Sequence, residues 1–205
     1  MSAHDVSSAI ARPDFAAIAQ WVAPGTKVLD LGCGDGSLLR YLQQTRNTRG
    51  YGVEIADANI ATCVKNGVNV IQMDLETGLS IFESNSFDYV ILSQTLQAMK
   101  NTEIVVREML RVGREGIVTF PNFGYWRHRL QVVRGHMPVS ERLPYQWYDT
   151  PNVHLCTLKD FEEFCASHGV HILERAVMSN GSVVSVMPNL LGSLAVYRFV
   201  QAKPA

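Results

Sequence analysis

Apolar residues along the chain form short uninterrupted runs that alternate with segments in which they recur at helical spacing. The uninterrupted runs predict strands at residues 27–31, 50–55, 68–72, 87–93 and 116–120. The helical spacing predicts helices that begin at Pro13 and Asp57, and two more over residues 37–44 and 102–112. Because strands alternate with helices, and the longest run shows little alternation of its own, the pattern predicts a doubly wound parallel sheet that is covered on both faces.

The last part of the chain departs from this alternation. A helical segment after Thr157 leads into two apolar runs, at residues 170–177 and 194–200. Turn signals separate these runs and leave no room for a crossover helix, so we expect them to pair antiparallel at the sheet edge. The predicted fold class is α/β: a single Rossmann-like sheet, mostly parallel with an antiparallel edge strand. We expect this one domain to occupy residues 13–205, behind a loose tail at residues 1–12.

Composition limits the chain to one ordinary domain. Its 205 residues are 47% hydrophobic, enough to bury a single core, and a net charge of −1 gives no general attraction to nucleic acid or to anionic membranes. No apolar run approaches the roughly 18 residues that a membrane helix needs. The first residues lack the basic and apolar regions of a secretory signal. We therefore expect a cytoplasmic protein that binds neither nucleic acid nor membranes.

The four cysteines are scattered without C-x-x-C spacing, so neither a disulfide framework nor a zinc site is expected. Cys63 and Cys165 fall at apolar helix positions and are predicted to lie in the core. His154 and Cys156 are close in sequence, but no third ligand or orienting residue stands at usable spacing. We predict a packing role for this pair, and no metal site.

The strongest local signal is the sequence VLDLGCGDG, in which a buried strand carries an acid and then breaks into alternating glycines. Without a Cβ, Gly32, Gly34 and Gly36 let the backbone approach a ligand closely. The small Cys33 lies between the first two. Ligands of doubly wound sheets bind beyond the carboxyl ends of the strands, and the next strand carries Glu54 at that end. Glu54 is predicted to bind ribose hydroxyls; the alternative is a solvated acid at a strand end.

Charge distinguishes the ligands that such a turn could bind. A dinucleotide fingerprint places its third glycine one position later, where this chain has Ser37. Asp30 and Asp35 flank the turn, and negative charge there opposes a pyrophosphate but favours a cationic group. S-adenosylmethionine carries a ribose, an ammonium and a sulfonium but no phosphate. The residues therefore favour this cofactor over a nicotinamide dinucleotide.

The same residues resemble the first motif, D/E-x-G-x-G-x-G, of class I S-adenosylmethionine-dependent methyltransferases, and the resemblance covers residues 24–121. In that family the acid that ends the second strand binds the ribose, which corresponds to Glu54. The resemblance implies that Asp74 meets the adenine and that the segment after the fourth strand lies near the methionine moiety. For Asp74, an exposed turn acid is the alternative. The cofactor-binding residues so predicted are Asp30, Gly32, Cys33, Gly34, Gly36, Glu54, Asp74, Leu75, Ser93 and Gln94.

Longer stretches resemble a narrower family, the methionine biosynthesis protein MetW, over nearly the whole chain. They lie at residues 29–39, 51–55, 67–71, 87–97, 120–124, 143–152 and 154–157. This resemblance implies a partner, a homoserine O-acyltransferase of MetX type, that the chain supports while it binds S-adenosylmethionine or S-adenosylhomocysteine. It implies no methyl acceptor and no catalytic residue. A genuine methyltransferase of a small molecule or protein is therefore the alternative function, and enzymatic activity stays open.

The connection over residues 122–156 is long and rich in aromatic residues, which favours an ordered functional segment over a disordered loop. Its rings could line an acceptor pocket, anchor a protein partner or close the core. Residues 125–134 predict a helix with Trp126 and Val133 on its apolar face, and with His128 among arginines on the more exposed face. The low net charge argues against a nucleic-acid surface there.

Overall fold

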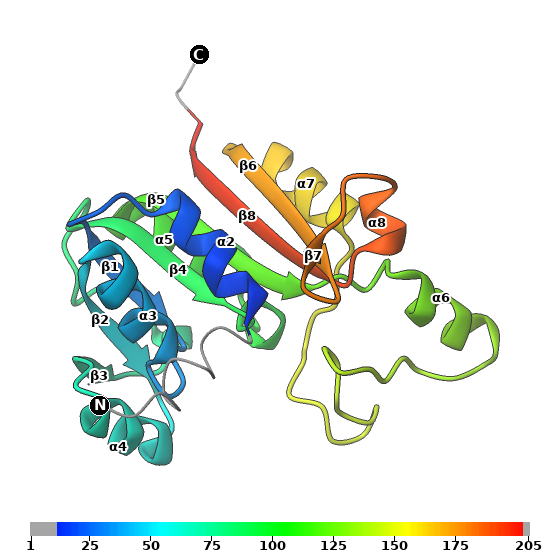
Figure 1. The fold of residues 1–205 in the computed structure, drawn as a ribbon, viewed down its shortest axis with the longest axis horizontal. Coiled ribbons are helices and arrows are strands. Elements are labelled where there is room, and N and C mark those ends of the chain that lie inside the picture. The colour runs from blue at the N-terminus through cyan, green and yellow to red at the C-terminus, as the bar shows by residue number, and fades with distance from the viewer. Residues whose placement is uncertain (1–11, 203–205) are drawn as a thin grey trace.

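The computed structural model describes residues 12–202, which form one mixed eight-stranded sheet (Figure 1). The strands follow the order β3-β2-β1-β4-β5-β8-β6-β7, in which β1 to β5 are parallel and β6, β7 and β8 run antiparallel to their neighbours. The predicted fold class is confirmed. The strands are β1 (Lys27–Leu31), β2 (Arg49–Glu54), β3 (Val70–Gln72), β4 (Phe87–Ser93), β5 (Gly113–Pro121), β6 (Val170–Ser179), β7 (Ser182–Val183) and β8 (Leu194–Gln201).

Helices cover both faces of the sheet, and each face has its own apolar cluster. One cluster packs α2 and α3 on the sheet, and the other packs α5 and α7 on the opposite face. None of the helices within residues 12–202 has the length and apolar character that crossing a membrane requires. The helices are α2 (Pro13–Trp21), α3 (Ser37–Arg46), α4 (Asp57–Lys65), α5 (Thr102–Val112), α6 (Trp126–Val133), α7 (Leu158–Ser167) and α8 (Pro188–Leu191), with short 3-10 helices η1 (Leu75–Thr77) and η2 (Leu96–Ala98).

The two C-terminal apolar runs pair as predicted. β6 and β8 are antiparallel, from Val170 opposite Gln201 to Met178 opposite Leu194. β8 also pairs antiparallel with β5, so it lies inside the sheet and leaves β6 and the short β7 at the edge. Of the predicted N-terminal tail, residues 1–11 lie outside the described residues, and only Arg12 is described.

Helix α6 buries a different face from the one predicted. His128 is 1% exposed, whereas Val133, on the predicted apolar face, is 84% exposed. Nδ1 of His128 donates to the Asn122 carbonyl oxygen at 3.2 Å, and Nε2 accepts from Ser140 Oγ at 2.9 Å. Burial lowers the pKa of His128, which favours the neutral ring that this pairing needs. The prediction of an exposed His128 is therefore wrong, because hydrogen bonds rather than an apolar stripe anchor this helix.

Figure 1 shows the connection between β5 and α7, which includes α6, projecting from one end of the sheet. The carboxyl ends of the parallel strands therefore lie next to two different parts of the chain. The ends of β1, β2 and β3 meet the glycine turn and α4, whereas the end of β5 leads into the projecting segment.

Candidate functional site

The carboxyl end of β1 leads into the glycine turn, which folds against the end of β2. Gly32 and Cys33 both donate their backbone N–H to the Val53 carbonyl oxygen, at 2.8 and 3.0 Å. Gly32 has a φ of +67°, and a Cβ there would come within 2.7 Å of Thr95 Oγ1. Gly34 also has a positive φ, but a Cβ there would meet nothing within 4 Å. The turn is therefore packed on the β4 side and open at Gly34, where a ligand can approach the backbone.

The end of the glycine turn is also the start of α3. Gly36 is the N-cap residue in the left-handed conformation, with a φ of +76°. The preceding Asp35 accepts hydrogen bonds from the backbone N–H and the Oγ of Ser37, at 3.0 and 2.6 Å. Asp35 therefore satisfies a free donor of the first helical turn while it keeps a negative charge beside the open backbone.

Glu54 closes the turn from the end of β2. Its Oε2 accepts from the Gly34 N–H at 2.9 Å, and its Oε1 accepts from the N–H groups of Ile55 and Ala56, at 2.8 and 2.9 Å. An ionised carboxylate offers about four acceptor sites. Three are used here by backbone, so one site on Oε2 is left for a further donor such as a hydroxyl. The solvated-acid alternative does not fit, because Glu54 is buried.

Asp30 is buried beneath the turn and is 1% exposed. Its Oδ1 has no hydrogen-bond partner among the described residues. Burial raises the pKa of the Asp30 carboxyl to about 8; the Arg12 guanidinium lowers it in part, and the carboxylates of Glu54 and Asp35 raise it. An unsatisfied buried acceptor costs roughly 1–3 kcal/mol. The fold therefore keeps an acceptor here that a donor or a cation on a ligand would satisfy.

Asp74 and Leu75 follow β3 and stand next to the end of β2, because the Met73 N–H donates to the Glu54 carbonyl oxygen at 3.0 Å. Leu75 is buried in the core. Asp74 is exposed, and its Oδ1 accepts from the Glu76 N–H at 2.9 Å to cap η1. This hydrogen bond is the one expected of the alternative prediction, an exposed acid in a turn. Its Oδ2 accepts no hydrogen bond from the described residues, so the predicted adenine contact stays open beside it.

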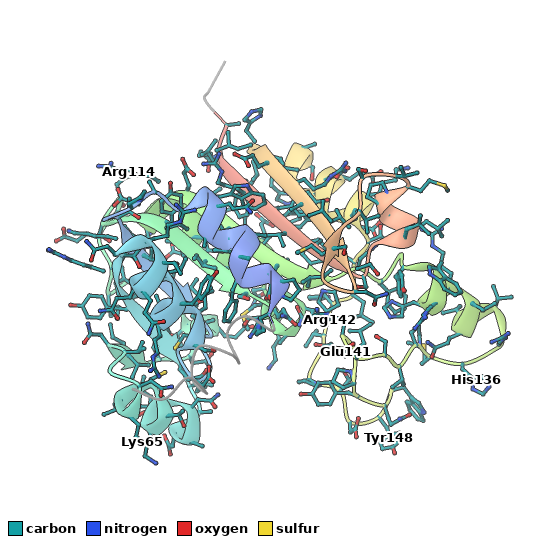
Figure 2. The ribbon with its side chains drawn as sticks, in the orientation of Figure 1. Lys65, Arg114, His136, Glu141, Arg142 and Tyr148 are labelled. Carbon is teal, nitrogen blue, oxygen red and sulfur yellow. The ribbon has the colours of Figure 1, made fainter. Side chains whose placement is uncertain are left out.

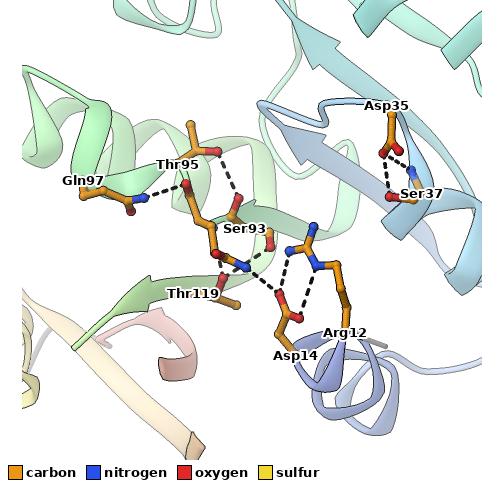
Figure 3. A network of polar contacts seen from close by, with 9 residues as sticks. Arg12, Asp14, Asp35, Ser37, Ser93, Thr95, Gln97 and Thr119 are labelled. Atoms are coloured by element: carbon orange, nitrogen blue, oxygen red, sulfur yellow. Dashed lines mark hydrogen bonds and ion pairs between the residues drawn. The ribbon is translucent and has the colours of Figure 1, made fainter. Parts of the chain in front are cut away.

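Gln94 follows β4 with a φ of +52°, which is uncommon for a residue other than glycine. Its backbone N–H donates to the Thr119 carbonyl oxygen at 2.9 Å, and its Nε2 donates to Asp14 Oδ2 at 3.1 Å. Ser93 Oγ lies 3.3 Å from Thr119 Oγ1. Figure 3 shows how Asp14, buried in α2, also accepts from Arg12 Nη2 at 2.7 Å. The segment after β4 is therefore held between β5 and α2.

Arg12 and Asp14 belong to this network although the sequence does not mark them. Asp14 stands in the first turn of a helix, where an acid is ordinary because of the helix dipole. Its bond to Gln94 spans 80 positions of sequence. The Arg12 guanidinium lies 4.2 Å from the centroid of the Phe15 ring, which fixes it over α2. Only the packing of α2 across the sheet brings these groups together.

The cysteines are free thiols, and two of them support the turn from below. Cys33 Sγ lies 3.8 Å from Cys63 Sγ, and the Cys63 thiol donates to the Gly34 carbonyl oxygen at 3.1 Å. Burial raises the pKa of both thiols, and it raises that of Cys156 to about 12, so the thiolate forms are disfavoured. The predicted core positions of Cys63 and Cys165 are confirmed. Within residues 12–202, no group of three or more His, Cys, Asp or Glu residues is arranged to hold a metal.

The connection at residues 122–156 divides into a packed part and an exposed part. Tyr125 is buried, and its ring meets the His128 ring edge to face with the ring centroids 5.5 Å apart. This contact closes that end of the core. Trp147 and Tyr148 are 73% and 71% exposed, and their rings meet edge to face with centroids 5.6 Å apart. Figure 2 shows Tyr148 at the tip of a loop that projects away from the sheet. Of the predicted roles, closing the core is the one that Tyr125 fits. Trp147 and Tyr148 fit the role of anchoring a protein partner.

Comparison with known proteins places the chain in a family. Residues 12–199 match the family described as methionine biosynthesis protein MetW. A curated protein of Rhodopirellula baltica, the bifunctional methionine biosynthesis protein MetXA/MetW, is 38% identical over an alignment of 171 residues, which covers 78% of this chain. The chain belongs to the MetW family. The matched region is 27% of the MetXA/MetW protein, so this MetW chain spans about a quarter of the length of that relative.

Solved structures agree on the fold of this MetW chain. A methyltransferase from Mesorhizobium loti superposes with a TM-score of 0.69 over 93% of this chain and 99% of that chain, at 14% identity. A methyltransferase from Thermotoga maritima superposes with a TM-score of 0.67 over 94% of this chain and 91% of that chain, at 16% identity. Both are described as dependent on S-adenosylmethionine. The [4+2]-cyclase SpnF superposes with a TM-score of 0.65 over 94% of this chain and 81% of that chain, at 18% identity. At these identities the likeness shows the fold alone, and the cyclase indicates that the fold does not determine the reaction.

We expect Asp30→Asn to change how stability depends on pH. The folded-state pKa of about 8 lies above the ordinary value of 3.8, so ionisation of Asp30 in the unfolded chain lowers the wild-type stability progressively between about pH 4 and 8. The free energy of unfolding of the wild type falls by at most about 1.4 kcal/mol per pH unit in this range. The neutral amide of Asp30→Asn does not ionise, so the variant loses no stability in this way.

Urea unfolding of both chains from about pH 5 to 9 measures this effect. The free energy of unfolding of Asp30→Asn minus that of wild type should rise up to about pH 8 and then level off. Asp57→Asn, at an exposed acid of α4, serves as the control for the loss of one acid outside the turn. A flat difference for Asp30→Asn would contradict the assignment of a raised pKa.

Proposed function

We propose that this chain is an S-adenosylmethionine-binding accessory subunit of methionine biosynthesis that supports a homoserine O-acyltransferase of MetX type. The observation that carries the cofactor half is the buried Asp30 carboxyl, whose Oδ1 has no hydrogen-bond partner among the described residues, together with the open backbone at Gly34. The partner half is supported by the relative of Rhodopirellula baltica, whose name joins MetXA and MetW in one polypeptide.

The charge around the turn fits a cationic adenosine. The carboxylates of Asp35 and Glu54 lie close enough to Asp30 to raise its pKa, and the Arg12 guanidinium, already bonded to Asp14, lowers it only in part. A phosphate would meet net repulsion there, whereas an ammonium or sulfonium would be attracted. When bound, S-adenosylmethionine supplies the positive charge and an activated methyl group. S-adenosylhomocysteine keeps the ribose and the ammonium and fits the same residues.

Each predicted residue has a place in this assignment. Glu54 binds a ribose hydroxyl through the acceptor site left on Oε2, and Asp30 meets the cationic end. Asp74 and Leu75, at the carboxyl end of β3, would meet the adenine, and the segment after β4 would lie near the methionine moiety. The residues that shape the turn and the segment after β4 are Gly32, Cys33, Gly34, Gly36, Ser93 and Gln94.

The connection at residues 122–156 is the surface we assign to the acyltransferase. Trp147 and Tyr148 stay exposed at its tip, and Trp and Tyr are enriched among the residues that dominate binding energy in protein interfaces. Its base is fixed to the core by His128, so the surface is presented on an anchored segment. Two separate chains with such a contact would correspond to the two halves that the relative joins covalently.

A cytoplasmic location is part of this proposal. Cys33 and Cys63 lie 3.8 Å apart and are nevertheless free thiols, which fits a reducing compartment better than an oxidising one.

We expect Glu54→Ala to weaken the binding of S-adenosylmethionine by roughly 1–3 kcal/mol, because a charged hydrogen-bond acceptor is lost. Calorimetric titration of the full chain measures this change, and NAD titrated in parallel should not bind. Glu83→Ala, at an exposed acid outside the site, is the matched control and should bind like wild type. An unchanged affinity in Glu54→Ala would remove Glu54 from the site, and binding of NAD would overturn the choice of cofactor.

We expect the homoserine O-acyltransferase of the same organism to be less active alone than with this chain. The double variant Trp147→Ala/Tyr148→Ala should weaken the association roughly tenfold or more and lose the stimulation, because two exposed anchors are removed. Tyr51→Ala removes an exposed aromatic residue on β2, far from the projecting segment, and should behave like wild type. Co-purification and acyl-transfer assays measure both effects.

An acyltransferase that is equally active alone would contradict the accessory role. Labelled S-adenosylmethionine supplied with cell extract then decides the alternative function. A methylated product that depends on this chain would identify a genuine methyltransferase, for which the intact cofactor motif is the supporting observation.

A further inference from the structure

A hollow outside the candidate cofactor site shares none of that site's residues. Its volume is about 340 Å³, within the range of small-molecule sites. Pro13, at the start of α2, forms one wall, and the β6–β7 turn forms another. The remaining wall comes from α6 and the loop after it, which contribute the charged residues Arg127, Glu141 and Arg142.

The two arginines of this hollow have no acidic partner. Neither Arg127 nor Arg142 makes an ion pair with any carboxylate in the part of the chain that the structure describes, and the Arg127 guanidinium contacts only the Trp126 ring, at 5.4 Å. Glu141 has no ion pair there either. The hollow therefore holds charges of both signs that form no ion pair among the described residues. Arginines elsewhere in the described chain that do bind carboxylates are Arg12, Arg107, Arg111, Arg114, Arg175 and Arg198.

The loop holds Glu141 and Arg142 in a fixed position. They are the two central residues of a tight turn, in which Ser140 and Leu143 exchange backbone hydrogen bonds of 2.9 and 3.1 Å. Leu143 is buried, and Ser140 Oγ bonds the buried His128 of α6. Figure 2 shows Glu141 and Arg142 side by side near the start of α2. A turn anchored at both ends loses little further freedom when a ligand binds.

We propose that this hollow binds a free α-amino acid. The guanidinium groups of Arg127 and Arg142 bind its carboxylate, for which their planar donor arrangement is suited, and Glu141 binds its ammonium. The bond between His128 and Ser140 ties the charged turn to α6. The proposal goes beyond the cofactor site and the acyltransferase, because it requires neither.

Thermal-shift measurements on the full chain, with the proteinogenic L-amino acids and L-homoserine as probes, identify the ligand. At least one free amino acid should raise the melting temperature, since a ligand that binds only the folded state stabilises it. Its methyl ester, which lacks the carboxylate, and its N-acetyl derivative, which lacks the ammonium, should each bind roughly tenfold more weakly in calorimetry.

Variants then place the ligand in the hollow. Arg142→Gln should weaken binding of the free amino acid roughly tenfold or more, whereas Arg134→Gln, at an exposed arginine that ends α6 outside the hollow, should not. Glu141→Gln should weaken binding of the free amino acid but not of its N-acetyl derivative. All three should bind S-adenosylmethionine like wild type, so failure here is distinguishable from failure of the cofactor assignment.

The proposal is overturned if no amino acid in the panel stabilises the chain, or if the ester binds as well as the free acid. It is also overturned if Arg142→Gln leaves amino-acid binding unchanged but abolishes association with the acyltransferase. That result would make the charged turn part of a protein interface.

Discussion

The structure depends on one unfavourable element, the Asp30 carboxyl, which is buried in β1 and whose Oδ1 has no hydrogen-bond partner among the described residues. Removing Asp30 from water raises its pKa to about 8, and the nearby carboxylates of Glu54 and Asp35 add to that effect. A sheet that needed only stability would place an apolar residue or a paired group there. The surrounding elements are arranged around this carboxyl: a turn with no side chain at its open point, and the Arg12 guanidinium, which lowers the pKa of Asp30 only in part.

The parallel order of the strands brings these groups to one place. β1, β2 and β4 are neighbours, so their carboxyl ends present the glycine turn, Glu54 and Gln94 to the same region. The antiparallel β8 separates β5 from the sheet edge and leaves the end of β5 free to lead into the projecting segment. One half of the molecule is thus suited to a cofactor. The other half presents exposed aromatic residues and a charged hollow, which are suited to a partner and a small ligand.

The sequence predicts the parts of this arrangement that depend on local physics. The strand, the glycine turn and α3 follow one another directly, so apolar spacing and glycine placement suffice, and Glu54 follows from its position at the end of the next strand. His128 could not be predicted correctly, because apolar spacing suggests the wrong face of α6 when hydrogen bonds to the segments before and after the helix anchor it. Asp14 could not be predicted at all, since its role comes from a contact with Gln94 that only the packed sheet creates.

The central claim is that Asp30 is held uncharged until a cationic cofactor arrives, and proton-linked calorimetry tests it most directly. With a pKa of about 8, Asp30 is mostly protonated at pH 7, and a bound ammonium or sulfonium would favour its ionised form. Titrations of S-adenosylmethionine at pH 7, in buffers of different ionisation enthalpy, should report release of close to one proton by the wild-type chain and roughly none by Asp30→Asn. Binding with no proton release by the wild type, or with equal release by both chains, would contradict the account.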